Sequence, residues 1–198
     1  MKERPILFSA PMVRALLDGS KTQTRRVVKR GISDVTDAYR HPALCPHGQP
    51  GDRLWVREAH WWFKDEHDPV TGYFPPKLTA EDVQYRADGD DDCKVWRPSI
   101  HMPRWASRIS LEITSVRVER MHNISETDAV AEGIQAVARG IWWKNYTYPN
   151  GFNGKPTLIV GYRTAKESYR SLWESINVTG SWVANPWVWV IEFRRLKP

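Results

Sequence analysis

Four stretches of the chain are predicted to be β-strands, and in the first and third of them polar and apolar residues alternate, as in half-buried strands. The stretches are TQTRRVVK from Thr22, RLWVREAHWW from Arg53, SRISLEITSVRVERM from Ser107 and NPWVWVIEFRRL from Asn185. In the third stretch the alternation changes phase near Ser115, which predicts a β-bulge there. A shorter strand is expected at 83–86. The chain is therefore predicted to be rich in strands.

Three other stretches have the spacing of short amphipathic helices. PMVRALLDG starts at Pro11 and ends at Gly19, a residue typical of helix C-termini. SETDAVAEGI offers Ser125 as an N-cap and Gly133 as a C-terminal glycine. RTAKESYRSLWESIN from Arg163 places its apolar residues on one face. We expect these helices to flank the strands.

Two long segments fit neither pattern and are interpreted as insertions into one domain that spans residues 1–198. Residues 64–103 contain DPVTGYFPP and the acidic run Asp90 to Asp92, which is expected to be a solvated loop. Residues 135–160 contain repeated Gly and Pro. Many strands with few short helices predict an α+β fold, a small mixed β-barrel flanked by helices, because closure removes exposed sheet edges.

Charge and aromatic content point to nucleic acid as a partner. Lys and Arg exceed Asp and Glu by six charges, which favours polyanions. Of the 11 Trp residues, several have a neighbouring cation, such as Trp55 near Arg57 and Trp105 beside Arg104. Indole and guanidinium planes are surfaces on which unpaired bases stack. Packing in the core is the alternative for each ring.

Cysteine content and hydropathy indicate a reduced, cytoplasmic setting. The chain has two Cys, and it contains no apparent leader and no apolar stretch of membrane-spanning length. Cys45 lies near His41 and His47, but no second Cys/His pair follows at metal-ligand spacing. We therefore expect no metal and no other cofactor.

The stretch DGSKTQTRR, residues 18–26, concentrates cations and hydroxyls at the junction between the first helix and the first alternating strand. Lys21 is expected to follow a turn made by Asp-Gly-Ser. Thr24 and Arg26 share one face of the strand, and Arg25 points to the other face. Arg25 is therefore expected to be the less engaged of the two arginines.

This stretch resembles the G-x-K-x-x-x-R signature of ASCH domains, whose fold is similar to the PUA barrel of RNA-modifying proteins. PGDRLWVRE, VERMHNISETDAVAEGI and NPWVWVIEFRRL resemble later segments of that family and occur in the expected order. The opening ERPILFSAPMVRALLDGSKTQTRR is similar to a branch carried by bacteriophages and prophages. The resemblance covers about half of the chain and implies a PUA-like barrel.

The resemblance also implies an activity. Small bacterial members of the family include amidohydrolases that remove the acetyl group of N4-acetylcytidine, and others are ribonucleases. The matching catalytic positions here are Lys21, Thr24, Arg26 and Glu132. Residues that would bind the nucleic acid or nucleoside are Arg25, Trp55, Arg57 and Trp105.

The residues leave several alternatives open. Lys21 can act as a general base, or Glu132 can carry the proton while Lys21 stays charged. The two can also form only a surface ion pair. As a whole, the chain can be a hydrolase of a modified nucleoside or RNA, a non-catalytic module that binds RNA or single-stranded nucleic acid, or a phage accessory protein that binds a host protein.

Overall fold

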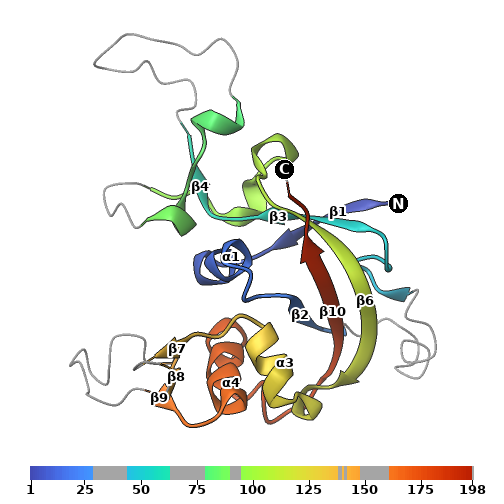
Figure 1. Cartoon of the computed structure of the whole chain (residues 1–198), viewed down its shortest axis with the longest axis vertical. Coiled ribbons are helices and arrows are strands. Elements are labelled where there is room, and N and C mark those ends of the chain that lie inside the picture. Colours follow the sequence, from blue (N-terminus) through green and yellow to red (C-terminus); the bar gives the residue numbers. More distant parts are fainter. Residues whose placement is uncertain are drawn as a thin grey trace.

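The computed structural model describes residues 1–28, 44–62, 79–89, 95–137, 140, 142–147 and 161–197. A five-stranded mixed sheet lies at its centre (Figure 1). Its strands are β1 (Glu3–Leu7), β2 (Gln23–Val27), β3 (Arg53–Arg57), β6 (Ser110–Arg120) and β10 (Trp187–Arg195). The strand order is β1-β3-β6-β10-β2, in which only β1 and β3 are parallel neighbours.

The four predicted strands are confirmed. One of the stretches is divided, because β3 is followed by a separate short strand, β4 (His60–Trp61). In the long pair β6–β10, Glu192 pairs with Ser115 and Phe193 pairs with Ile113. Thr114 is thus the extra residue of a bulge, next to the predicted break at Ser115.

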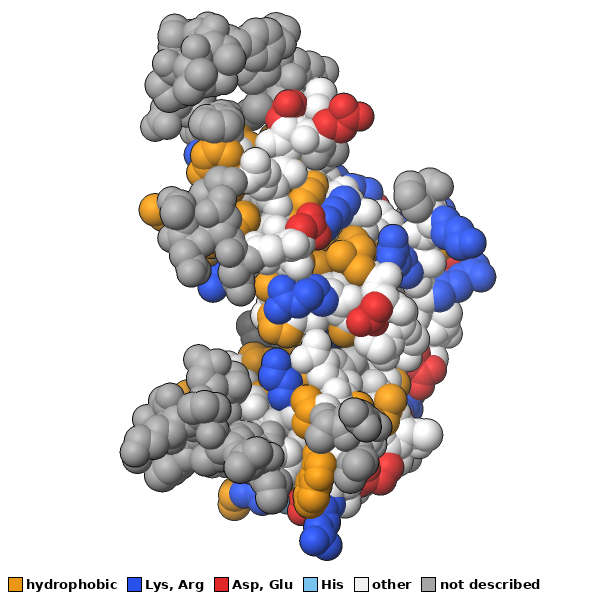
Figure 2. Space-filling view, turned by 60° about the vertical axis from the view of Figure 1, so that its left-hand side comes forward, with side chains coloured by type: hydrophobic (Ala, Val, Ile, Leu, Met, Phe, Trp, Pro, Cys, Tyr) orange, Lys and Arg blue, Asp and Glu red, His pale blue; other side chains and the backbone are white. Residues whose placement is uncertain are grey.

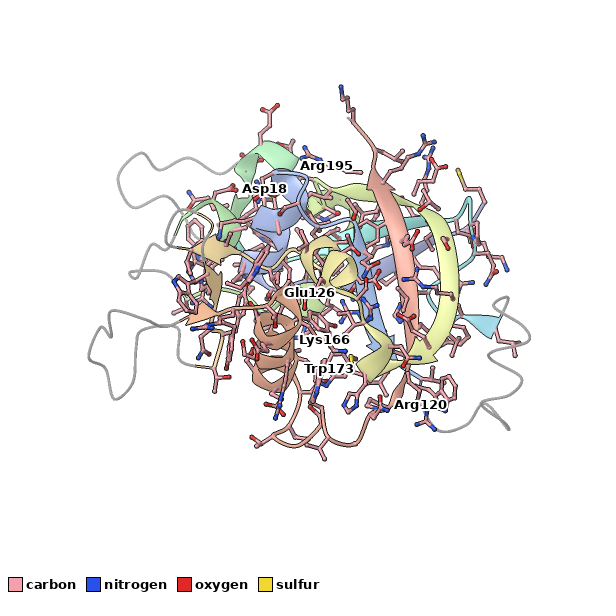
Figure 3. All side chains as sticks on the ribbon, turned by 60° about the horizontal axis from the view of Figure 1, so that its bottom comes forward. Asp18, Arg120, Glu126, Lys166, Trp173 and Arg195 are labelled. Carbon is pink, nitrogen blue, oxygen red and sulfur yellow. The ribbon has the colours of Figure 1, made fainter. Side chains whose placement is uncertain are left out.

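The three predicted helices are also present. They are α1 (Ala10–Leu17), α3 (Glu126–Ala131) and α4 (Ala165–Ile176). Ser125 caps α3 by accepting the N–H of Asp128, whose carboxylate in turn accepts the N–H of Ser125. Glu126 accepts the N–H of Ala165 at 2.7 Å, which holds the start of α4 against α3 (Figure 3).

Strand β10 separates two apolar clusters, which explains its nearly continuous apolar sequence. Trp189, Ile191 and Phe193 belong to a cluster that includes α1, β1 and β3. Val188 and Val190 belong to a second cluster, with α3 and α4. A strand that is buried on both faces needs apolar side chains at successive positions.

The expected closed barrel is not found among the described residues. Strands β1 and β2 end the sheet order on opposite sides, and the described part of the chain contains no backbone pairing between them. A side chain joins these edges instead, since Arg26 Nη2 donates to the Leu7 carbonyl at 2.7 Å. The architecture is an α+β fold with an open mixed sheet.

Parts of both predicted insertions form small sheets. The first sheet pairs β4 with β5 (Gln84–Tyr85), so the expected strand at 83–86 is confirmed. The second sheet contains β7 (Ala136–Val137), β8 (Trp142–Lys144) and β9 (Gly161–Tyr162). Short 3₁₀ helices cover Ala80–Asp82, Arg86–Asp88, Ser99–His101, Arg104–Ala106 and Met121–Asn123.

Some sequence-based expectations fall outside this description. Asp90 to Asp92 and His41 are not among the described residues. Cys45 is a buried member of the core. Of the helices that are described, none combines the length and the apolar character needed to cross a membrane.

Candidate functional site

Lys21 enters the site from a turn, as its sequence context predicts. Asp18 Oδ1 accepts the N–H of Ser20 at 2.8 Å, and Gly19 has a φ of 82°. Lys21 then forms an isolated antiparallel bridge with Glu132. The backbone itself therefore brings together two residues that are 111 positions apart.

The Lys21 ammonium is completely buried and has three acceptors. Nζ lies 2.8 Å from the carbonyl oxygens of Gln23 and Glu132 and 3.0 Å from Glu132 Oε2. Burial lowers the pKa of Lys21, and the negative charge of Glu132 opposes this shift. The pair that the sequence allowed as a surface ion pair is thus a buried one.

Glu132 is positioned by the end of α3. It is the C-cap residue of this helix, and Gly133 follows with a φ of 82°, a conformation that favours glycine. A Cβ atom at Gly133 would lie 2.7 Å from Ala15 Cβ and 2.8 Å from Lys21 Cβ. The close approach of α1, Lys21 and Glu132 therefore requires glycine here.

Arg25 is more engaged than its strand position predicts, so the expectation from alternation is wrong. Its side chain is fully buried, and Nη1 lies 3.2 Å from Glu132 Oε1. Nη2 lies 2.5 Å from Glu119 Oε1 and 3.3 Å from Asp128 Oδ2. Because β2 ends the sheet order, the site extends past its edge to the face that Arg25 occupies.

Arg117 extends this charge network toward the surface. Its guanidinium lies 3.2 Å from Asp128 Oδ1 and 3.7 Å from Glu119 Oε2, and it also bonds to Glu192. Acidic and basic side chains therefore alternate from the buried Lys21 to the half-exposed Arg117. Each buried carboxylate in this network has a cationic partner.

Arg26 differs from Arg25 because it contacts no carboxylate among the described residues. Its Nη2 bonds to the carbonyl of Leu7, and its guanidinium carbon lies 5.3 Å from the centre of the Phe8 ring. Its Nε is buried and has no hydrogen-bond partner within the described part of the chain. Arg26 thus contributes a positive charge that no described residue neutralises by contact.

A cavity of about 320 Å³ joins these elements. Thr24, Arg25, Arg26 and Glu132 contribute to its wall, and Lys21 lies behind Glu132. The rest of the wall comes from Leu7, Phe8, Ser9, Met12, Val27, Ser99, Tyr169, Leu172, Trp173, Ile176 and Asn177. On the side of the molecule shown in Figure 2, Lys, Arg and hydrophobic side chains lie around a hollow in the surface.

Three residues of the cavity wall carry buried N–H groups that no described residue accepts. Arg25 Nε, Arg26 Nε and Trp173 Nε1 are buried without a hydrogen-bond partner among the described residues. Arg25 and Trp173 are only 4% and 5% exposed. A buried polar group without a partner is unfavourable, so these N–H groups favour a ligand with several acceptor atoms.

Tyr169 and Trp173 are site residues that the sequence did not identify. Both belong to the apolar face of α4, on which Trp173 is labelled in Figure 3, and the helical pattern assigns that face to the core. Burial raises the pKa of Tyr169 well above its usual value, and the charge of Glu132 adds to the shift. Tyr169 therefore presents a neutral phenol. No sequence signal separates a cavity wall from a core face here.

The other proposed binding residues lie away from this cavity. Trp55 is 9% exposed, with the guanidinium carbons of Arg57 and Arg104 at 4.8 Å and 5.8 Å from its ring centre. Trp105 is 44% exposed, and its ring centre lies 5.4 Å from the ring centre of Trp62. Neither Trp55, Arg57 nor Trp105 contributes to the cavity wall. The structure does not bring these three residues together with Lys21 and Glu132.

Comparisons with known proteins give one structural match to report. Neither a protein-family model nor a curated protein matches the chain. Among solved structures, the chain is similar to an ASCH domain from Lactobacillus crispatus, with 14% sequence identity and a TM-score of 0.38. The alignment covers 98% of this chain and 79% of that chain. A similarity of this size carries no conclusion about activity.

Proposed function

We propose that the chain is a hydrolase that acts on an acylated nucleobase of the N4-acetylcytidine type, either as a nucleoside or within RNA. One observation carries this proposal: Thr24, Arg26 and Glu132 line the same cavity, and Lys21 is hydrogen-bonded directly behind Glu132. These are the four positions that the ASCH-like motif assigns to catalysis.

The residues can supply each part of amide hydrolysis. The reaction needs a nucleophile, a carrier for the proton and a positive group near the developing oxyanion. Water, or the Thr24 hydroxyl followed by water, attacks the acyl carbon. Glu132 takes up the proton and delivers it to the leaving nitrogen as the C–N bond breaks. The unpaired Nε–H of Arg25, whose Nη1 contacts Glu132, donates to the oxyanion.

The geometry favours Glu132 over Lys21 as the proton carrier. The three acceptors of Lys21 Nζ match the three N–H bonds of an ammonium, which has no lone pair to accept a further proton. Glu132 also lines the cavity, whereas Lys21 lies behind it. In this proposal Lys21 keeps Glu132 ionised and fixed in position.

Substitution of Thr24 tests the proposal directly. Thr24→Val preserves the shape of a buried side chain and removes the hydroxyl, and Thr22→Val is the matched control at an exposed position. Chromatography measures the rate at which cytidine is released from N4-acetylcytidine. We expect this rate to fall about 100-fold or more in Thr24→Val and to stay unchanged in Thr22→Val. No release by the wild-type protein would contradict the proposal. Equal rates in both variants would contradict attack by the Thr24 hydroxyl and leave water as the nucleophile.

A second candidate is a module that binds nucleic acid without catalysis. It is favoured by the engagement of both Glu132 carboxylate oxygens, one by Lys21 and one by Arg25. A titration of labelled single-stranded RNA at several salt concentrations separates the candidates. Binding by phosphate contacts predicts a linear fall of log affinity with log salt in the absence of turnover.

A further inference from the structure

We infer that the cavity binds a nucleoside phosphate, and that Arg26 with the start of α1 holds the phosphate group. This inference rests on the proposed function and names the form of its substrate. Its main support is the position of Arg26, a cation in the cavity wall that contacts no carboxylate among the described residues.

The start of α1 lies beside Arg26. Arg26 bonds to the Leu7 carbonyl and lies over the Phe8 ring, and Ser9, the next residue, is the N-cap of this helix. The Ser9 hydroxyl does not cap the helix, and both Ser9 and Met12 line the cavity. The first N–H groups of a helix have no acceptor inside it and favour anions. In α1 these are the N–H groups of Ala10 and Met12, because Pro11 has none.

A phosphate needs the donors that meet here. Arg26 supplies charge and Ser9 supplies a hydroxyl, and both residues line the cavity. Guanidinium groups form strong charge-assisted hydrogen bonds to phosphate oxygens. The negative charge of Glu132 is matched separately by Lys21 and Arg25, so Arg26 remains available for the ligand.

The remainder of the cavity suits a nucleobase. Tyr169 and Trp173 supply aromatic walls, with Met12 and Leu172 beside them. The Trp173 indole N–H, which is buried and unpartnered, offers one donor for a ring acceptor. A volume of about 320 Å³ is near the lower end of the usual range for small-molecule sites. The site therefore combines an aromatic and apolar wall with donors that suit an anion.

Calorimetric binding of cytidine, its 5′- and 3′-monophosphates and a cytidine dinucleotide tests this inference. We expect at least one monophosphate or the dinucleotide to bind about tenfold more tightly than cytidine. Preference for the dinucleotide identifies a phosphodiester of RNA, and preference for a monophosphate identifies a free nucleotide. Equal binding of all probes, or no binding of any phosphate form, overturns the inference.

Two variants and one control locate the phosphate. Arg26→Gln removes the charge, and Ser9→Asp places a repelling carboxylate at an N-cap position where Asp stabilises helices. Both should abolish the tenfold preference. Arg194→Gln removes an exposed Arg that bonds to Glu112 and should retain it. A preference that survives in Arg26→Gln and Ser9→Asp overturns the inference.

The same probes separate this inference from the proposed hydrolysis, because none of them carries an acyl group. Hydrolysis of N4-acetylcytidine by a protein with no preference for phosphate overturns the phosphate site alone. A preference for phosphate in a protein that releases no cytidine from N4-acetylcytidine overturns the hydrolase alone.

Discussion

Lys21 Nζ lies 3.0 Å from Glu132 Oε2 in the interior of the protein, and the two residues are also joined by a backbone bridge. Loss of one member leaves the other charge buried without its partner. We expect Lys21→Met to lower the free energy of unfolding by about 3–5 kcal/mol. Urea denaturation at neutral pH measures this change.

The double variant Lys21→Met with Glu132→Gln is the control for this pair. Because the second substitution removes the uncompensated carboxylate, the double variant should lose less stability than the sum of the single variants. If Lys21→Met lowers the free energy of unfolding by less than about 1 kcal/mol, as expected for an exposed ion pair, the result would contradict the buried arrangement.

Gly133 controls the distance between α1 and the Lys21–Glu132 pair. Gly133→Ala adds a Cβ within 2.8 Å of both Ala15 and Lys21 side chains and also has a positive φ. Gly180→Ala is the matched control, with a φ of 85° and no atom within 4 Å of the added Cβ. We expect Gly180→Ala to lower the free energy of unfolding by about 1–2 kcal/mol and Gly133→Ala to lower it clearly more. Equal melting temperatures for the two variants would exclude a steric role.

Asp128 makes part of the stability depend on pH. Burial acts to raise its pKa, but hydrogen bonds from Ser125 and the charges of Arg25 and Arg117 hold the pKa below the usual value. The unfolded chain therefore binds a proton at this carboxyl before the folded chain does. The stabilisation is present above about pH 4 and is lost as the pH falls through the lower, folded pKa.

Asp128→Asn isolates this contribution. The variant should be less stable than the wild type at pH 7, and the difference should narrow as the pH falls below about 4. Urea denaturation at a series of pH values measures how the free energy of unfolding of each protein changes with pH. A difference that stays constant from pH 7 to the acid range would show that Asp128 acts only as an uncharged cap.

Local signals predicted most of the fold. Alternation located the strands, and the change of phase near Ser115 located the bulge, because both patterns arise from neighbouring residues. Ser125 and Gly133 marked the ends of α3 for the same reason. Barrel closure is a relationship between β1 and β2, which are distant along the sheet order, and no local pattern reports it.

The site was only partly predictable because it depends on contacts between distant segments. The motif identified Thr24 and Glu132, which do line one cavity. Alternation placed Arg25 on the opposite face of the strand from Thr24 and Arg26, and we therefore expected it to be less engaged in the site. It did not show that β2 lies at the end of the sheet, where all three residues line one cavity. Proximity in sequence paired Trp55 with Arg57, which does lie over the indole, but it paired Arg104 with Trp105 and missed the contact of Arg104 with the Trp55 ring.

Arg25 joins three carboxylates from two elements, which makes it a test of the whole network. Arg25→Met leaves Glu119, Asp128 and Glu132 close together with less compensating charge, so we expect a loss of about 3–5 kcal/mol in the free energy of unfolding. Arg117→Met is the matched control, because Arg117 also contacts several carboxylates but is 35% exposed. Arg117→Met should lower the free energy of unfolding by about 1 kcal/mol or less, because water screens the charges of Arg117 and its partners. Denaturant titration of both variants distinguishes these values, and equal losses would show that burial does not determine the strength of this network.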